Sequence, residues 1–237
     1  MDTSKSDFDA HKLGEIAAVA CFFALTCSVM ATLFTHVSPA TVLPVCVGGL
    51  LGFGAADFIS GIVHWLADRY GSPQTPVIGA TFITPFREHH EDPTDITRSD
   101  FFMTTGHTAM VVIPVLLSTY GLSLNAATGP VFMLHSTITA MCIFLFATNL
   151  FHRWAHLEEI TPAIRWAQRL GLSLSKEHHA VHHAFPHDVR YCITTGLFNP
   201  LLDRIDFWSR MEALILRLTG IEPYRDPEQM AQPIAAP

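Results

Sequence analysis

The sequence is poor in charged residues, which excludes an ordinary soluble domain. Only 15% of its 237 residues are Asp, Glu, Lys or Arg, whereas 49% are hydrophobic, and the mean hydropathy is +0.31. This composition predicts a membrane protein. The chain also lacks any run of Lys or Arg and has a net charge of −7, which argues against a nucleic-acid partner.

Cysteine is also scarce and lacks the spacing of common metal and redox motifs. The five cysteines are Cys21, Cys27, Cys46, Cys142 and Cys192, and no two of them form a CxxC pair. Because the first four lie in apolar runs, we expect small buried side chains in a reducing setting.

Four long apolar runs are present, at residues 13–34, 41–67, 107–124 and 130–154. At about 1.5 Å per residue the first reaches roughly 33 Å, enough to cross a hydrocarbon core of about 30 Å. A cleaved signal peptide is disfavoured for this run, since it is longer than a signal core and follows polar residues. The sequence therefore predicts an all-α, integral membrane bundle of four transmembrane helices. Pro44 and "GGLLGFG" are expected to loosen the second helix.

The basic residues predict the orientation of these helices. All 14 Lys and Arg lie in the N-terminal tail, between the second and third runs, or after residue 152, and none lies in the other two connections. Because basic residues stay on the cytoplasmic side, both termini are predicted cytoplasmic, in the inner membrane of a bacterium or the endoplasmic reticulum of a eukaryote.

The predicted organisation is a tail (1–12), one membrane domain (13–220) and a second tail (221–237). Residues 155–220 form a cytoplasmic helical, His-rich cap in this scheme. Thr161-Pro162 starts one short helix that ends at Gly171, Ser175 caps another, and a third runs from Asn199-Pro200 to about Gly220. The third helix is amphipathic, which fits either the membrane surface or packing against other helices.

Histidine is abundant, with 14 residues, and most of them fall in four motifs. The predicted topology places all four at the cytoplasmic membrane edge: "VHWLAD" (His64, Asp68), "REHHED" (His89, His90), "HRWAH" (His152, His156) and "EHHAVHHAFPH" (His178, His179, His182, His183, His187). Residues four apart share one helix face and can bind one ion. One zinc ion needs about four ligands, so this larger set predicts a dinuclear site. Imidazole suits Zn, Cu, Fe and Ni, so donor type does not choose the metal.

Other interpretations of these residues stay open. Clustered histidines also serve as helix caps, pH sensors or lipid headgroup contacts, and Asp68 is also compatible with a solvated helix end. Asp57 is expected to support a ligand from a neighbouring helix or to hydrogen-bond across the bundle. Asn149, one turn before His152, is placed to supply an amide oxygen to a metal or to its bound water. His11, His36, His107 and His135 are interpreted as solvated or packing residues.

Five motifs occur in order along the chain: "ADFISGIVHWLAD", "PFREHHEDPTDITRSDF", "NLFHRWAH", "HHAVHHAFPHD" and "YCITTGLFN". Together they resemble the Kua family of lipid desaturases, which includes the plasmanylethanolamine desaturases and the bacterial CarF proteins. The resemblance implies a membrane di-iron enzyme that uses O2 and electrons to form the vinyl-ether double bond of plasmalogens from 1-O-alkyl phospholipids. The resemblance also implies that the histidines of the four motifs and Asp68 form the metal site. Among them, His187 matches the pattern of the animal members of the family.

Chemistry favours the same activity, because removing hydrogen from an unactivated methylene needs a redox metal with O2. No flavin, haem or iron–sulfur motif is present, so an external ferredoxin or cytochrome b5 is the expected electron donor. A fatty-acyl desaturase or a hydroxylase with the same site is the nearest alternative. The sequence lacks the HExxH motif of zinc hydrolases, which argues against that class. A metal transporter would place its site near the membrane midplane, whereas these histidines are predicted at one membrane edge. Arg87 and Arg190 are candidates for headgroup contacts.

Overall fold

The computed structural model describes residues 3–125 and 128–225, and in these residues every regular element is helical. The four long helices are α1 (Thr3–His36), α2 (Val42–Arg69), α4 (Phe101–Leu117) and α5 (Gly129–His156). A short 3-10 turn, η3 (Ser118–Gly121), extends α4. Each of the four has an apolar stretch long enough to cross a membrane. The prediction of an all-α bundle with four spans is confirmed.

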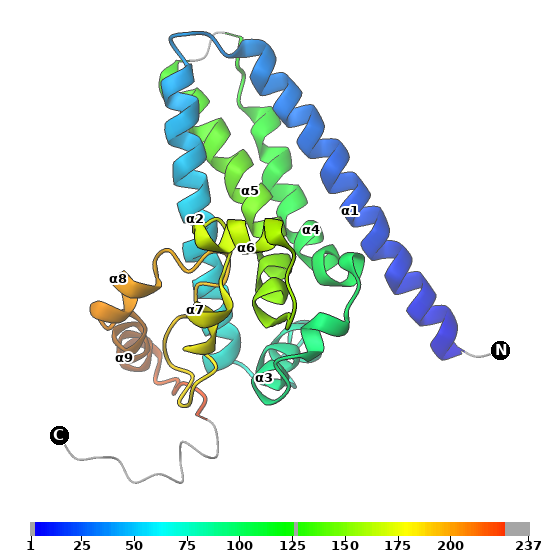
Figure 1. The fold of residues 1–237 in the computed structure, drawn as a ribbon, viewed down its shortest axis with the longest axis vertical. Coiled ribbons are helices and arrows are strands. Elements are labelled where there is room, and N and C mark those ends of the chain that lie inside the picture. Colours follow the sequence, from blue (N-terminus) through cyan, green and yellow to red (C-terminus); the bar gives the residue numbers. More distant parts are fainter. Residues whose placement is uncertain (1–2, 126–127, 226–237) are drawn as a thin grey trace.

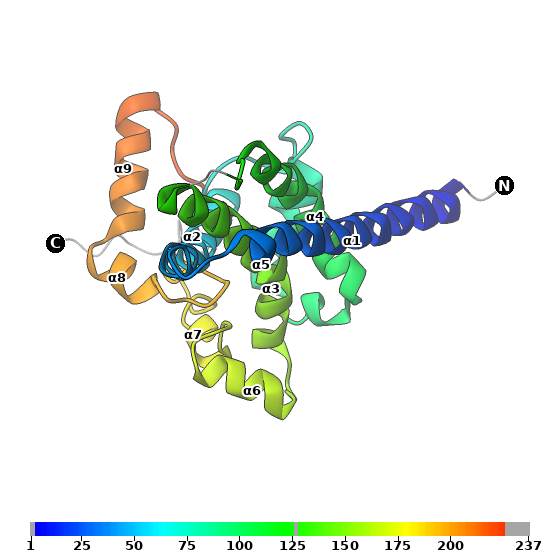
Figure 2. The ribbon, with the colours of Figure 1, turned by 90° about the horizontal axis from the view of Figure 1, so that it is seen from above.

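The bundle has two different ends (Figure 1). The α1–α2 and α4–α5 connections lie at one end, whereas the π-helix η1 (Gly79–Ile83), α3 (Thr84–Glu91), η2 (Asp95–Arg98) and α7 (Lys176–Ala180) lie toward the other. Seen from above, α1 extends away from the other helices toward its N-terminal end (Figure 2). The histidine motifs belong to the end that holds α3 and α7.

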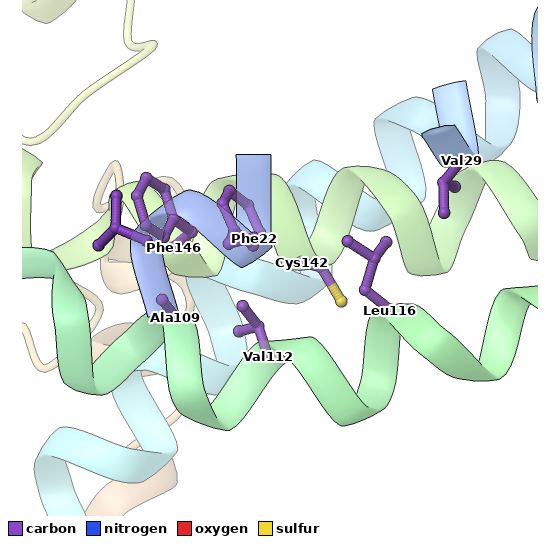
Figure 3. Close-up of a cluster of buried hydrophobic side chains, with 8 residues drawn as sticks. Phe22, Val29, Ala109, Val112, Leu116, Cys142 and Phe146 are labelled. Atoms are coloured by element: carbon purple, nitrogen blue, oxygen red, sulfur yellow. The ribbon is translucent and has the colours of Figure 1, made fainter. Parts of the chain in front are cut away.

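The main core joins α1, α4 and α5 (Figure 3). Phe22 of α1 stacks on Phe146 of α5 with ring centroids 4.1 Å apart, and Val112 and Leu116 of α4 are buried in the same cluster. Aromatic stacking adds to the packing between helices that are apolar all round. This cluster holds α1 against the rest of the bundle.

Glycines let α2 and α5 approach closely. A Cβ at Gly48 would lie 2.3 Å from the Met133 carbonyl oxygen, and one at Gly52 would lie 2.3 Å from that of Thr137. The expectation that this glycine-rich segment loosens α2 is wrong, because α2 is continuous from Val42 to Arg69. The small residues make a packing surface instead.

Several helix boundaries follow from capping side chains. Asp100 starts α4 earlier than predicted, because its Oδ1 accepts a hydrogen bond from the Met103 N–H at 3.0 Å. Thr161 and Ser175 cap α6 (Pro162–Arg169) and α7, as predicted. The predicted third cap helix is wrong as one element, since Asp206 in the left-handed conformation (φ 50°) separates α8 (Asn199–Arg204) from α9 (Phe207–Thr219).

Trp208 of α9 is buried against Trp65 and Tyr191, and the Arg69 Nε of α2 donates to the Glu212 Oε1 at 2.7 Å. Packing against other helices is therefore a role of α9.

The expectation of buried cysteines holds for Cys142 and is wrong for Cys21, Cys27 and Cys46, which are exposed. These three lie on outward faces of helices long and apolar enough to span a membrane, where an apolar residue needs no protein neighbour.

Candidate metal centre

The four histidine motifs meet at one end of the bundle and form two groups of potential ligands. In each group the potential ligand atoms all lie within 4.8 Å of one another. The five-histidine group contains His89, His152, His156, His179 and His183. The four-residue group contains His64, Asp68, His90 and His182. The structure therefore brings together nine of the eleven residues that the sequence marks as ligands.

Two pairs of consecutive residues divide between these groups. His89 of α3 belongs to the five-histidine group, whereas His90 belongs to the four-residue group. After α7, His183 and His182 divide in the same way, with ring centroids 5.7 Å apart. One short segment thus serves both groups, so the groups are adjacent.

The five-histidine group is suited to a metal ion by its short nitrogen contacts. The Nε2 of His179 lies 2.8 Å from that of His152 and 3.0 Å from that of His183. The Nε2 of His156 lies 3.0 Å from that of His89 and 3.2 Å from that of His152. Each imidazole nitrogen carries either one N–H or one lone pair in the ring plane. It can therefore take part in only one hydrogen bond of this kind, as donor or as acceptor. These four contacts cannot all be hydrogen bonds, whereas one cation can accept a lone pair from every ring.

Asp68 organises the four-residue group. Its Oδ2 lies 3.1 Å from the Nε2 of His90 and 3.3 Å from that of His64. The outward Nδ1 of His64 lies 3.1 Å from the Tyr191 carbonyl oxygen, and that of His182 lies 2.7 Å from the Val189 carbonyl oxygen.

These two carbonyls accept from Nδ1–H, which leaves the Nε2 lone pairs of His64 and His182 facing inward. Both Nε2 atoms are buried without a hydrogen-bond partner in the described part of the chain. A metal ion would supply the missing partner, so this group also suits a cation.

Burial and mutual repulsion favour the neutral form of four of these rings, those of His89, His179, His182 and His183. Desolvation, followed by the neighbouring His156, lowers the pKa of both His89 and His183 to about 2. Desolvation also lowers the pKa of His179 and His182 well below the ordinary value for histidine. Neutral imidazole is the form that binds metal. A pH-sensing face is therefore disfavoured, and so are headgroup contacts, since His179 and His182 are at most 1% exposed.

His178 and His187 lie outside both groups. The Nε2 of His178 lies 2.9 Å from the Asn199 amide nitrogen, and its ring packs on Gly196, where a Cβ would lie 2.6 Å from that Nε2. The Nδ1 of His187 lies 3.1 Å from the His182 carbonyl oxygen, and its ring centroid lies 4.6 Å from that of His90. His187 therefore contacts two residues of the four-residue group, whereas His178 contacts the loop that follows this motif.

The buried Asp57 holds the loop that follows the last histidine motif. Its Oδ1 accepts hydrogen bonds from the backbone N–H groups of Thr195 (2.7 Å) and Gly196 (2.8 Å), and its Oδ2 accepts one from Phe198 (3.1 Å). This loop begins at Tyr191, whose carbonyl oxygen orients His64. Asp57 is thus an anchor for a segment that positions a potential ligand, which answers the question the sequence left open.

We predict that Asp57→Ala destabilises the protein more than Asp57→Asn does. Alanine leaves three N–H donors without an acceptor, and the two buried ones, of Thr195 and Gly196, cost about 1–3 kcal/mol each. Asparagine retains one oxygen that can accept from Thr195 and Gly196. Thermal unfolding in detergent measures the difference, and equal midpoints for the two variants would show that the carboxylate does not anchor the loop.

A cavity of about 610 Å³ borders the five-histidine group. His89 and His152 line it, together with Met103, Thr104 and Asn149 of the spans. Its lining also includes exposed acidic residues, namely Glu88, Glu91, Asp92 and Asp95. The volume is in the range of ligand pockets. The cavity therefore gives an outside molecule a route to the histidines.

Two candidate headgroup residues have other partners. The Arg87 Nη2 donates to the Gly71 carbonyl oxygen at 3.1 Å, and its guanidinium stacks on the Tyr224 ring at 3.9 Å. Arg190 pairs with Asp203 at 2.7 Å.

Asn149 donates to the Thr108 hydroxyl at 3.1 Å and lines the cavity.

Sequence reasoning missed the supporting groups. The carbonyls of Tyr191 and Val189 orient two rings, and Asn199 bonds both His178 and the Cys192 backbone. The motif "YCITTGLFN" contains two of these residues and was the available signal. Backbone carbonyls have no signature of their own in a sequence.

Comparison with known proteins gives consistent matches. The family model of the lipid desaturase domain matches residues 53–226. Plasmanylethanolamine desaturase of Myxococcus xanthus is 39% identical over 212 residues, which cover 90% of this chain and 74% of the relative. Plasmanylethanolamine desaturase 1 of Mus musculus is 39% identical over 201 residues (83% and 73%). Chloroplastic fatty acid desaturase 4 of Arabidopsis thaliana is 33% identical over 177 residues (74% and 53%). No solved structure gives a significant match.

Proposed function

The chain belongs to the lipid desaturase family, and from that premise we propose that it forms the vinyl-ether double bond of plasmalogens. Family membership makes it an oxidoreductase. The proposed substrates are 1-O-alkyl phospholipids such as plasmanylethanolamine, because two relatives at 39% identity bear that name. The observation that carries the proposal is the pair of adjacent ligand groups, with a cavity beside the five-histidine group that residues of α4 and α5 help to line.

The proposed cofactor is a pair of iron ions, one for each group. Five nitrogen donors exceed the four ligands of a typical zinc site, and imidazole suits iron. When bound, such a pair supplies the redox chemistry that activates O2 toward an unactivated C–H bond. The proposed ligands are the nine residues of the two groups. His178 and His187 are proposed to position their neighbours, because both lie outside the groups.

The protein's own side chains hold the ligands and shape the route for the lipid. The backbone carbonyls of Tyr191 and Val189 fix two rings, and Asp57 fixes the loop that contains Tyr191. The alkyl chain is proposed to enter past Met103 and Thr104, so that its first methylenes lie near His89 and His152. The same cavity admits O2.

The overall reaction needs an external reductant. One O2 becomes two waters by taking four electrons, two from the broken C–H bonds of the lipid and two from a donor. The two substrate hydrogens and two protons from solvent complete the waters. A ferredoxin or a cytochrome b5 is the proposed donor, since the sequence has no flavin, haem or iron–sulfur motif.

The proposed orientation places both termini and both ligand groups on the cytoplasmic side. The basic residues favour this, because the connections at the far end of the bundle contain no Lys or Arg. The proposed desaturase domain is residues 13–220, and the family match from 53 to 226 supports most of it. A phospholipid whose headgroup lies at the cytoplasmic membrane interface would then have its alkyl chain beside the two ligand groups.

Lipid analysis tests the function. Cells that express the protein and receive a 1-O-alkyl phospholipid should make a product lighter by two hydrogens, with an acid-labile ether. Cells that express His152→Ala are the matched control. A product with one added oxygen would instead show hydroxylation, and a double bond confined to the acyl chain would show a fatty-acyl desaturase.

A further inference from the structure

A third cluster of metal-binding side chains lies apart from both ligand groups, at the α1–α4 junction. It contains His11 and Glu15 of α1 and His107 of α4, with potential ligand atoms within 4.8 Å of one another. The Glu15 Oε1 lies 3.6 Å from the Nδ1 of His11 and 3.7 Å from the Nδ1 of His107. Neither His11 nor His107 belongs to one of the four histidine motifs.

Glu15 is a buried carboxylate in the N-terminal half of α1. Its side chain is 3% exposed, and both imidazoles lie within 4 Å of its Oε1. Gly106 makes the burial possible, because a Cβ there would lie 2.6 Å from the Glu15 Cβ. A buried carboxylate needs a positive partner, since burying an isolated charge is costly.

We propose that these three residues bind one divalent transition-metal ion, with zinc as the favoured occupant. Zinc takes nitrogen and carboxylate ligands at about 2.0–2.2 Å, which separates tetrahedral ligand atoms by roughly 3.4 Å. The observed 3.6 and 3.7 Å need only a small contraction. The side chains of His11 and His107 are 61% and 55% exposed, so water can complete the coordination.

The proposed ion fastens α1 to α4 and so to the rest of the bundle. The family match begins at residue 53, so α1 lies outside it, and the N-terminal part of α1 leans away from the other helices. His107 is one helical turn from Met103 and Thr104, which line the cavity beside the five-histidine group. The ion pair of Lys12 with Asp100 (2.7 Å) joins the same two helices nearby. The inference does not depend on the proposed function, since it concerns different residues.

Zinc uptake by the iron-loaded, full-length protein in detergent tests the site. We expect one zinc ion per chain beyond the iron, measured by elemental analysis after dialysis against zinc. The double variant His11→Asn, His107→Asn and the variant Glu15→Gln should lose this ion, with affinity reduced beyond the roughly 10–100-fold of outer-partner substitutions. His36→Asn, which removes an imidazole from the other end of α1, is the matched control and should retain it.

Hydrogen exchange of α1 gives a readout independent of activity. Zinc should slow exchange in the first half of α1 in the wild type and in His36→Asn, but not in the double variant. Unchanged zinc uptake in the double variant would overturn the proposal. It would also be overturned by protection of α1 that follows acidification and ignores zinc, because protonated imidazoles would then be the partners of Glu15.

Discussion

Replacing His179 or His152 by alanine is expected to abolish lipid desaturation while the protein still inserts in the membrane. The two Nε2 atoms lie 2.8 Å apart at the centre of the five-histidine group, so each variant removes a proposed ligand. Loss of a direct ligand should exceed the roughly 10–100-fold loss caused by substituting an outer partner. The yield of vinyl-ether lipid, normalised to the protein in the membrane fraction, measures the effect.

His178→Ala is the informative comparison, because His178 directly precedes His179 in the sequence. His178 contacts Asn199 and Gly196 rather than the ligand group, so its loss should reduce activity by no more than about 100-fold. His36→Ala should be without effect, since that side chain bonds Asn125 and Thr32 at the opposite end of the bundle. Normal activity in His179→Ala would remove His179 from the proposed ligands.

Removal of the metal is expected to give an inactive protein that ferrous iron restores and zinc does not. The proposed chemistry needs a metal that changes its oxidation state, and zinc does not. Because the ligands are buried, removal should require a strong chelator and long incubation. Turnover of a 1-O-alkyl phospholipid with an electron donor and O2 measures the loss and the recovery. Equal recovery with zinc would contradict a redox role for the metal.

The four spans could be predicted from the sequence because length and hydropathy are properties of single segments. The same reasoning could not show how the segments pack. Gly48 and Gly52 favour a loosened helix when α2 is considered alone, but they form a close contact once α5 lies beside them. The break at Asp206 was missed for a similar reason, since the amphipathic pattern continues across α8 and α9.

The candidate site could be predicted as a set of residues but not as two groups. Spacing along a helix places His152 with His156, and the structure keeps them together. Spacing does not separate His89 from His90 or His182 from His183, because the division depends on where α3 and α7 lie relative to α2 and α5. The third cluster was missed because Glu15 and His107 are 92 residues apart in sequence and meet only through the contact at Gly106.

The iron content of the purified protein tests the central claim most directly. Elemental analysis of the wild type should give two iron ions per chain. A variant of the four-residue group, such as His64→Ala with His90→Ala, should retain one in the intact five-histidine group. One iron per chain in both proteins, or stoichiometric zinc without iron in the wild type, would contradict a di-iron centre built from these two groups.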